Sequence, residues 1–274
     1  MSGKLHAIVA SLSLGCVVNA APAAEQAAAA PTAAHTLGAA KLIIDDVKEN
    51  QAFYEQMFGM KEVAHYSAAD VYDEPIMGFG DGARLALFSP LKEPALKKSQ
   101  YPVALIYTAQ FDAVVKRIED AKHPIQRLPP AASGPYRIAI ARDPSGNAIE
   151  IFARDNGSEA VGGAKLIVAD RQKAEDFFVQ VFGAKPVQRF NTAAYDEVLL
   201  GFNQGFLALF QPKNEAPLPK SQFPVVALYT TEFDAVLERV KQIGLGYREV
   251  KASAGSRIII ARDPSGNGVE IIGK

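Results

Sequence analysis

The stretch "ARDPSGNAIEIF" at positions 141–152 returns almost unchanged as "ARDPSGNGVEII" at positions 261–272. In each copy the residues "DPSGN" precede a short apolar run with one glutamate, Glu150 in the first copy and Glu270 in the second. Asp, Pro, Gly and Asn favour turns, and runs rich in Ile and Val favour strands. The repeat therefore predicts the same turn and strand twice in the chain.

Further pairs of segments indicate that a whole domain is duplicated. In chain order they are "AKLI" at 40–43 and 164–167, "YDE" at 72–74 and 195–197, "KSQ" at 98–100 and 220–222, and "FDAV" at 111–114 and 233–236. Their order is the same in both halves, as expected for a tandem repeat. We expect two domains, residues 38–155 and 160–274, with the boundary in the polar, glycine-rich stretch "RDNGSEAVGG".

Each domain alternates between strand and helix patterns. "AAKLIID" (39–45) is a strand-like run, "VKENQAFYEQMFG" (47–59) has apolar residues at helical spacing, and three strand-like runs follow. The second part of the domain repeats this order, with "FDAVVKRIEDA" (111–121) as its helix. The sequence thus predicts four βαβββ modules, two in each domain, and an α+β fold.

The first 24 residues differ from the rest of the chain. Lys4 precedes an apolar stretch at 7–18 and small residues follow, a pattern typical of a secretory signal peptide. We expect residues 1–24 to be this signal, residues 25–37 to be an alanine-rich tether, and the mature protein to be periplasmic or secreted. Lipid attachment at Cys16 is the less favoured alternative. Because Cys16 is the only cysteine, cleavage after it leaves no thiol for a disulfide or a zinc–thiolate site.

Composition argues against two classes of partner. Basic and acidic residues are interspersed and the net charge is −1, so nothing indicates nucleic acid. The body of the chain has no apolar run of membrane-spanning length, so we expect no membrane contact once the signal is removed. A homodimer is compatible with the sequence, which does not fix the oligomeric state.

The order of motifs resembles the vicinal oxygen chelate superfamily, which includes glyoxalase I, bleomycin-resistance proteins and extradiol dioxygenases. The motifs are a strand, then Asp46, "FY" at 53–54, "FG" at 58–59, and finally "DPSGN-x-x-E". The resemblance covers both domains. It implies that the modules curl their sheets into open barrels, with the helices outside and a ligand cavity inside.

The resemblance also implies a divalent metal that acts as a Lewis acid. Three or four His, Glu or Gln ligands on the first and last strands of the modules would hold it. At the corresponding positions this sequence has two glutamates among small or apolar residues: Ala39, Ala86, Val103, Glu150, Gly163, Ala208, Val225 and Glu270.

The histidines do not replace the missing ligands. His6 lies in the expected signal peptide and His35 in the tether. His65 and His123 have no counterpart in the second domain. We therefore expect no metal and no other cofactor, with a divalent metal as the less favoured alternative.

Alternation along the last two strands of a domain assigns a direction to each side chain. In "AIEIF" (148–152) we expect Ile149 and Ile151 to pack under the helices and Glu150 to face the cavity. In "YRIAIAR" (136–142) we expect Ile138 and Ile140 to face the helices.

This phase turns Arg137 inward beside Glu150, and Arg257 beside Glu270. The favoured interpretation is an ion pair between two partly buried charges, present in both domains. The alternative is a binding or catalytic site, in which the arginine holds a substrate carboxylate or enolate and the glutamate is the base.

Three other repeated features carry weaker signals. Tyr107 and Tyr229 are in phase with Val103 and Val225, so we expect them to point inward and either fill the barrel or stack on an aromatic ligand. The "KSQ" lysines are expected in solvent, or the adjacent Ser and Gln are hydrogen-bond donors at the cavity mouth. The acids of "YDE" read most simply as solvated residues at the start of a strand.

These features leave three functions open. The favoured one is an exported protein that binds a small molecule, aromatic or with vicinal oxygens, in barrels whose metal site has degenerated. The second is a lyase, isomerase or ring-cleaving dioxygenase with a non-standard or absent metal site. The third is a structural or assembly role, in which the second domain completes an interface with the first.

Overall fold

The computed structural model describes residues 34–274 except 93–95, 130–135, 156, 215–218 and 251–254. The expected signal peptide with Cys16, and most of the expected tether, lie outside the described residues. No helix of the described part is long and apolar enough to cross a bilayer.

Each half of the chain contains two βαβββ modules, as predicted. The first half consists of β1 (His35–Ile43), α1 (Val47–Phe58), β2 (Lys61–Ala68), β3 (Tyr72–Gly78), β4 (Arg84–Pro90), β5 (Ala104–Thr108), α2 (Phe111–Asp120), β6 (Ile125–Arg127), β7 (Ile138–Arg142) and β8 (Ala148–Ala153). The second half consists of β9 (Ala160–Ile167), α4 (Arg171–Phe182), β10 (Lys185–Asn191), β11 (Tyr195–Phe202), β12 (Gly205–Pro212), β13 (Val226–Thr230), α5 (Phe233–Ile243), β14 (Tyr247–Val250), β15 (Arg257–Arg262) and β16 (Gly268–Gly273).

Local sequence signals set the ends of the first helix of each half. The side chain of Asp46 accepts a hydrogen bond from the Glu49 backbone N–H at the start of α1. Gly59 ends α1 with a φ of 73°, a left-handed conformation that favours glycine. Asp170 and Gly183 do the same for α4.

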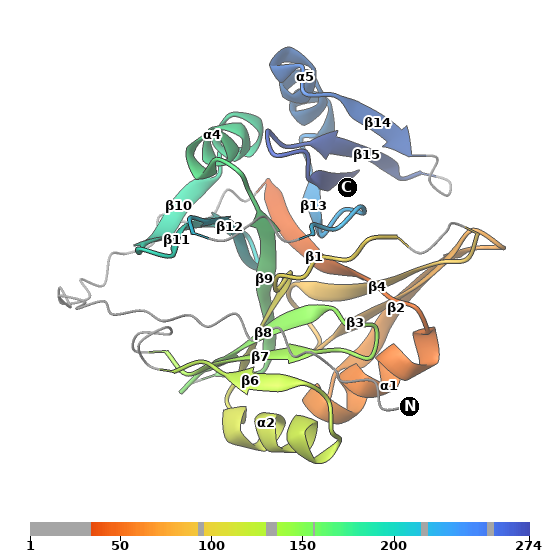
Figure 1. The fold of residues 1–274 in the computed structure, drawn as a ribbon. Coiled ribbons are helices and arrows are strands. Elements are labelled where there is room, and N and C mark those ends of the chain that lie inside the picture. The colour runs from red at the N-terminus through yellow and green to blue at the C-terminus, as the bar shows by residue number, and fades with distance from the viewer. Residues whose placement is uncertain (1–33, 93–95, 130–135, 156, 215–218, 251–254) are drawn as a thin grey trace, which may run out of the picture.

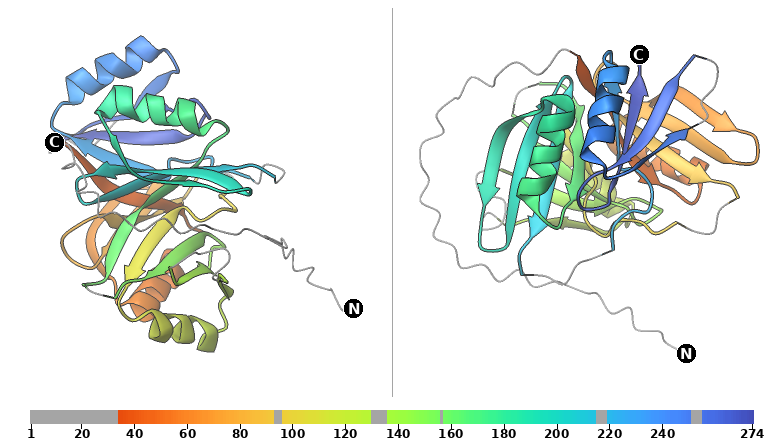
Figure 2. Two further views of the ribbon diagram at one scale, coloured as in Figure 1. Left: turned by 90° about the vertical axis from the view of Figure 1, so that its left-hand side faces the viewer. Right: turned by 90° about the horizontal axis from the view of Figure 1, so that it is seen from above.

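The strands form two eight-stranded sheets, and each sheet joins one module from each half of the chain. Sheet A has the order β14-β15-β16-β13-β1-β4-β3-β2, and sheet B the order β10-β11-β12-β9-β5-β8-β7-β6. Antiparallel pairing of β1 with β13 joins the two modules of sheet A, and antiparallel pairing of β5 with β9 joins those of sheet B. In Figures 1 and 2, α1 and α2 lie at one end of the molecule and α4 and α5 at the other, with the strands between them.

The two faces of each sheet differ in composition. On β1, Ala40 and Leu42 join the main hydrophobic core together with Phe53 of α1, so this face lies against the helices. Ala39 and Lys41 alternate with them and lie on the opposite face, which we call the inner face.

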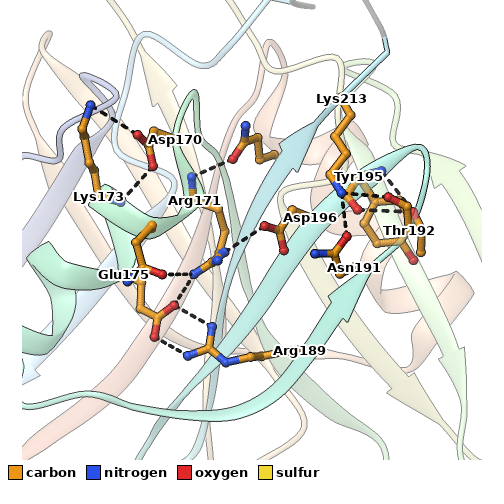
Figure 3. Close-up of polar contacts among 12 residues, drawn as sticks. Asp170, Arg171, Lys173, Glu175, Arg189, Asn191, Thr192, Tyr195, Asp196 and Lys213 are labelled. Atoms are coloured by element: carbon orange, nitrogen blue, oxygen red, sulfur yellow. Dashed lines mark hydrogen bonds and ion pairs between the residues drawn. The ribbon is translucent and has the colours of Figure 1, made fainter.

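A charged network attaches α4 to sheet B (Figure 3). Glu175 of α4 binds Arg171 at 2.5 Å and Arg189 of β10 at 2.5 and 2.7 Å. Arg171 also reaches Asp196 of β11, at 3.3 Å. Each of these two arginines therefore has a carboxylate partner.

Strand β1 begins at His35, earlier than the expected end of the tether. His35 is 3% exposed, and its Nδ1 lies 2.9 Å from the Thr230 hydroxyl of β13. Pairing with β13 continues to this end of β1, where Thr36 lies opposite Tyr229. His35 is thus part of sheet A rather than of a tether, because a partner strand from the other half satisfies its backbone.

Candidate functional site

A buried lysine lies between two carboxylates on the inner face of sheet A. Nζ of Lys41 (β1) is 2.6 Å from Oε2 of Glu270 (β16) and 2.9 Å from Oε1 of Glu74 (β3). The lysine side chain is 4% exposed, and the two carboxylate side chains 12% and 10%. Since Glu270 comes from the other half of the chain, this Lys41 triad exists because sheet A joins the two halves.

Sheet B carries the equivalent Lys165 triad. Nζ of Lys165 (β9) is 2.7 Å from Oε2 of Glu150 (β8) and 3.0 Å from Oε1 of Glu197 (β11). Burial of a charged side chain is costly unless it is paired, and each triad supplies that pairing.

The triads favour a charged lysine. Burial acts to lower the pKa of Lys41, but Glu270 and Glu74 outweigh it and hold this pKa above its usual range. Lys165 behaves alike between Glu150 and Glu197. Burial raises the pKa of Glu74 and of Glu197, and the adjacent ammonium offsets only part of that rise. Glu74 and Glu197 are therefore the carboxylates that take up a proton more readily than an exposed glutamate.

An aromatic residue from each "KSQ" loop lies near each triad. The Phe223 ring stacks on Phe88 with centroids 3.8 Å apart, and Nζ of Lys41 is 5.2 Å from the Phe223 centroid. In sheet B, the ring centroids of Tyr101 and Phe210 are 6.0 Å apart, and Nζ of Lys165 lies 5.1 Å from the Phe210 centroid. The loop with Phe223 and the carboxylate Glu270 both come from the second half of the chain. The loop with Tyr101 and the carboxylate Glu150 both come from the first half.

The loop lysines are not in solvent, so that expectation is wrong. Lys98 binds the Asp45 carboxylate and donates to the Ser145 carbonyl at 2.9 Å. Lys220 donates to the Ser265 carbonyl at 2.6 Å. Residues of both loops, Ser99 and Ser221 among them, line a cavity of about 10 Å³, which is enough for one water.

The expected ion pair between Arg137 and Glu150 does not form. Ile140 lies directly opposite Glu150, so the isoleucines of β7 are on the inner face and Arg137 is on the helix side. Arg137 binds Asp112 of α2 at 2.5 Å and is 54% exposed.

Arg257 is likewise turned outward, and binds Asp234 at 2.8 Å. Its side chain is 53% exposed. The expected phase was wrong because Ala139 and Ala141, and not the larger isoleucines, face the helices in this part of sheet B.

Tyr107 and Tyr229 lie on the inner faces, as expected. Burial raises the pKa of each phenol, and the nearby carboxylate, Glu150 or Glu270, adds to the rise. The Tyr229 ring lies so close to Gly38 that a Cβ there would be 2.0 Å from it, and Tyr107 covers Gly162 in the same way. Their role in ligand binding stays a prediction.

The sequence profile of the Glyoxalase/Bleomycin resistance protein/Dioxygenase superfamily matches residues 33–151 and 160–271. The chain belongs to this superfamily.

Solved structures of the superfamily have the same fold. Glyoxalase I from Zea mays is 21% identical over 87% of this chain and 92% of its own, with a TM-score of 0.74. A putative dioxygenase from Bacillus subtilis is 16% identical over 87% of this chain and 84% of its own, with a TM-score of 0.66. No curated protein matches the sequence significantly. At these identities the likeness supports the fold and not a shared reaction.

The residues at the superfamily's metal-ligand positions do not fit a divalent metal. Sheet A brings together Ala39, Ala86, Val225 and Glu270, all buried. Glu270 is the single donor in this set, and Lys41 binds it. Sheet B has the same arrangement, with Glu150 as the donor. Within the described residues no group of three or more His, Cys, Asp or Glu side chains is placed to hold a metal ion.

The two lysines and the glutamates of "YDE" were missed by the sequence analysis. Glu74 and Glu197 are each 8% exposed, so the expectation of solvated acids is wrong. The signal was present in "AKLI": a lysine in the same phase of two otherwise apolar strands requires a buried anion in each sheet.

Proposed function

We propose that this protein is a metal-independent member of the superfamily that binds a small molecule, aromatic or with vicinal oxygens, on the inner face of its sheets. One observation carries the proposal: the Lys41 ammonium binds Glu270, the one donor left at the superfamily's ligand positions in sheet A. An internal cation takes up the negative charge that a metal would otherwise need. A ligand on the inner faces can still contact tyrosines, apolar side chains and hydrogen-bonding groups.

The expected export of the chain is part of this proposal. After export, the protein would bind its ligand outside the cytoplasm. N-terminal sequencing of the mature protein tests the expected cleavage after residue 24 or earlier.

The first experiment is metal analysis by mass spectrometry, combined with a ligand screen. The mature protein is purified without chelator or affinity tag, and small aromatic and vicinal-oxygen compounds are then screened by thermal shift. We expect far less than one metal per chain and a raised melting temperature with a subset of compounds. Stoichiometric iron, manganese, nickel or zinc would overturn the proposal.

An enzyme is the second candidate, a lyase, isomerase or ring-cleaving dioxygenase acting on a vicinal-oxygen substrate. The observation that favours it is the raised pKa of Glu74, a buried carboxylate next to the Lys41 ammonium, because a general base works best with a pKa near the working pH. Turnover that is abolished by Glu74→Gln, with binding retained, would select the enzyme. A structural role would instead predict neither binding nor turnover.

A further inference from the structure

The two inner faces differ at a position that the repeat makes equivalent. Arg84 begins "RLALFSP" (84–90) and Phe206 begins "FLALFQP" (206–212). Arg84 pairs with Ala39 across β4 and β1, and Phe206 pairs with Gly163 across β12 and β9. Sheet A therefore has a cation where sheet B has an apolar ring.

A second difference lies next to each triad. Ala227 is the neighbour of Glu270 on β13, and Leu105 is the neighbour of Glu150 on β5. Leu105 extends over Gly163, where a Cβ would lie 3.3 Å from its Cδ1. The methyl group of Ala227 fills less of the corresponding space in sheet A.

Arg84 lacks a partner in the part of the chain that the structure describes. Its side chain is half-buried, and no carboxylate or carbonyl of the described residues binds it. Arg171 and Arg189, by contrast, both bind Glu175 (Figure 3). The Arg84 guanidinium is therefore free to bind an anion, and a planar carboxylate binds such a group through two parallel hydrogen bonds.

Two tyrosines lie on the same face of sheet A as Arg84. Tyr66 lies opposite Glu74, and Tyr229 lies two residues after Ala227, the neighbour of Glu270, so both rings share the inner face with Arg84. Tyr66 is 49% exposed, and Nζ of Lys274 lies 5.2 Å from the Tyr229 ring centroid. A ring placed beside Arg84 would thus meet aromatic surfaces and a second cation.

We propose that the inner face of sheet A, and not that of sheet B, binds a small aromatic carboxylate. Arg84 holds the carboxylate, and Tyr66 and Tyr229 contact the ring. The inference rests on the proposed function, because it assigns that binding to one face and to one class of ligand. Lys41 balances one of the two carboxylates of its triad, and Arg84 is a further cation on this face.

The test compares benzoate and 4-hydroxybenzoate with their neutral amides, benzamide and 4-hydroxybenzamide. Binding to the mature protein is followed through backbone amide resonances in NMR titrations. We expect each acid to bind about tenfold or more tightly than its amide, as an Arg–carboxylate pair requires. The shifted resonances should belong to β2, β3, β4 and β13.

Two variants of Arg84 and one control separate the faces. Arg84→Gln removes the charge, and Arg84→Phe copies the residue of sheet B; each should remove the preference for the acids. Phe206→Ala alters the equivalent place in sheet B and should change the affinity less than twofold. Spectra of the remaining residues show whether each variant is folded.

The outcomes distinguish this inference from the proposed function. Amides that bind as tightly as the acids, or acids that bind Arg84→Gln as tightly as the wild type, would overturn the inference and leave the proposed function standing. A loss with Phe206→Ala equal to that with Arg84→Gln would overturn the assignment to sheet A. If neither acids nor amides bind, the inference fails, and the thermal-shift screen of the wider set of compounds decides the proposed function.

Discussion

Nζ of Lys41 and Oε2 of Glu270 lie 2.6 Å apart, although 229 positions separate the two residues in the sequence. The contact joins β1 to β16, the first and the last strand of the described residues. It also fixes the register of sheet A at its centre, because both residues lie on strands adjacent to β13.

Lys41→Met should destabilise the protein by about 3–5 kcal/mol, since it leaves Glu74 and Glu270 buried without a cation. Equilibrium unfolding in urea at neutral pH measures the loss. A triple variant in which Glu74 and Glu270 are also replaced by Leu should recover most of it. A cost below about 1 kcal/mol for Lys41→Met would show that the triad is not buried as described.

Arg137→Ala should change the free energy of unfolding by less than about 1 kcal/mol, because the pair with Asp112 is exposed. Ligand affinity should be unchanged, because Arg137 lies on the helix side of sheet B. Arg257→Ala is the matched variant in sheet A. A large loss of affinity in either variant would contradict the outward direction of the arginine and support the inward direction that the sequence suggested.

Gly38→Ala should destabilise the protein by about 1–3 kcal/mol, because the added Cβ would lie 2.0 Å from the Tyr229 ring. Thermal unfolding measures the effect. Adding Tyr229→Ala should relieve part of the clash, so the double variant should lose less than the sum of the single ones. Gly78→Ala is the control on the same sheet, since its Cβ would meet its nearest neighbour at 3.6 Å and fit without strain.

Asp143 should make stability fall as the pH rises between about 4 and 6. Burial raises its pKa from 3.8 to about 6, partly opposed by hydrogen bonds from Asn147 and Tyr54. A carboxyl with a raised pKa contributes its full stability below the unfolded pKa and loses it as the pH passes the folded one. Position 143 cannot titrate in Asp143→Asn. The wild type should therefore lose stability relative to this variant as the pH rises across this range. Equal pH slopes for the two proteins would contradict the prediction.

Much of the fold was predictable because its signals are local. Asp46 and Gly59 mark the ends of α1 in the sequence, and the "DPSGN" turns fix the last hairpin of each half. The pairing of β1 with β13, and so the exchange of modules between the sheets, was not predictable. It depends on contacts between distant segments, which no local pattern records.

The site was predictable only in part, for a related reason. Glu150 and Glu270 were placed on the inner face correctly, because strand alternation carries that information. The predicted direction of the Arg137 side chain was wrong. Both faces of β7 are apolar, so hydrophobicity alone does not show which face of this strand points inward. Lys41 was passed over because its partners lie on other strands.

The composite sheets also bear on how the two repeats have diverged. Each repeat contributes one module to sheet A and one to sheet B, so each inner face is built from both repeats. Substitutions in one repeat are therefore distributed over both faces, and each face can change through either copy. Arg84 differs from Phe206 and Ala227 differs from Leu105, and the first residue of each pair lies on sheet A in a different repeat. A ligand on one inner face therefore contacts residues of both repeats, so the structural unit of binding is the sheet and not the repeat.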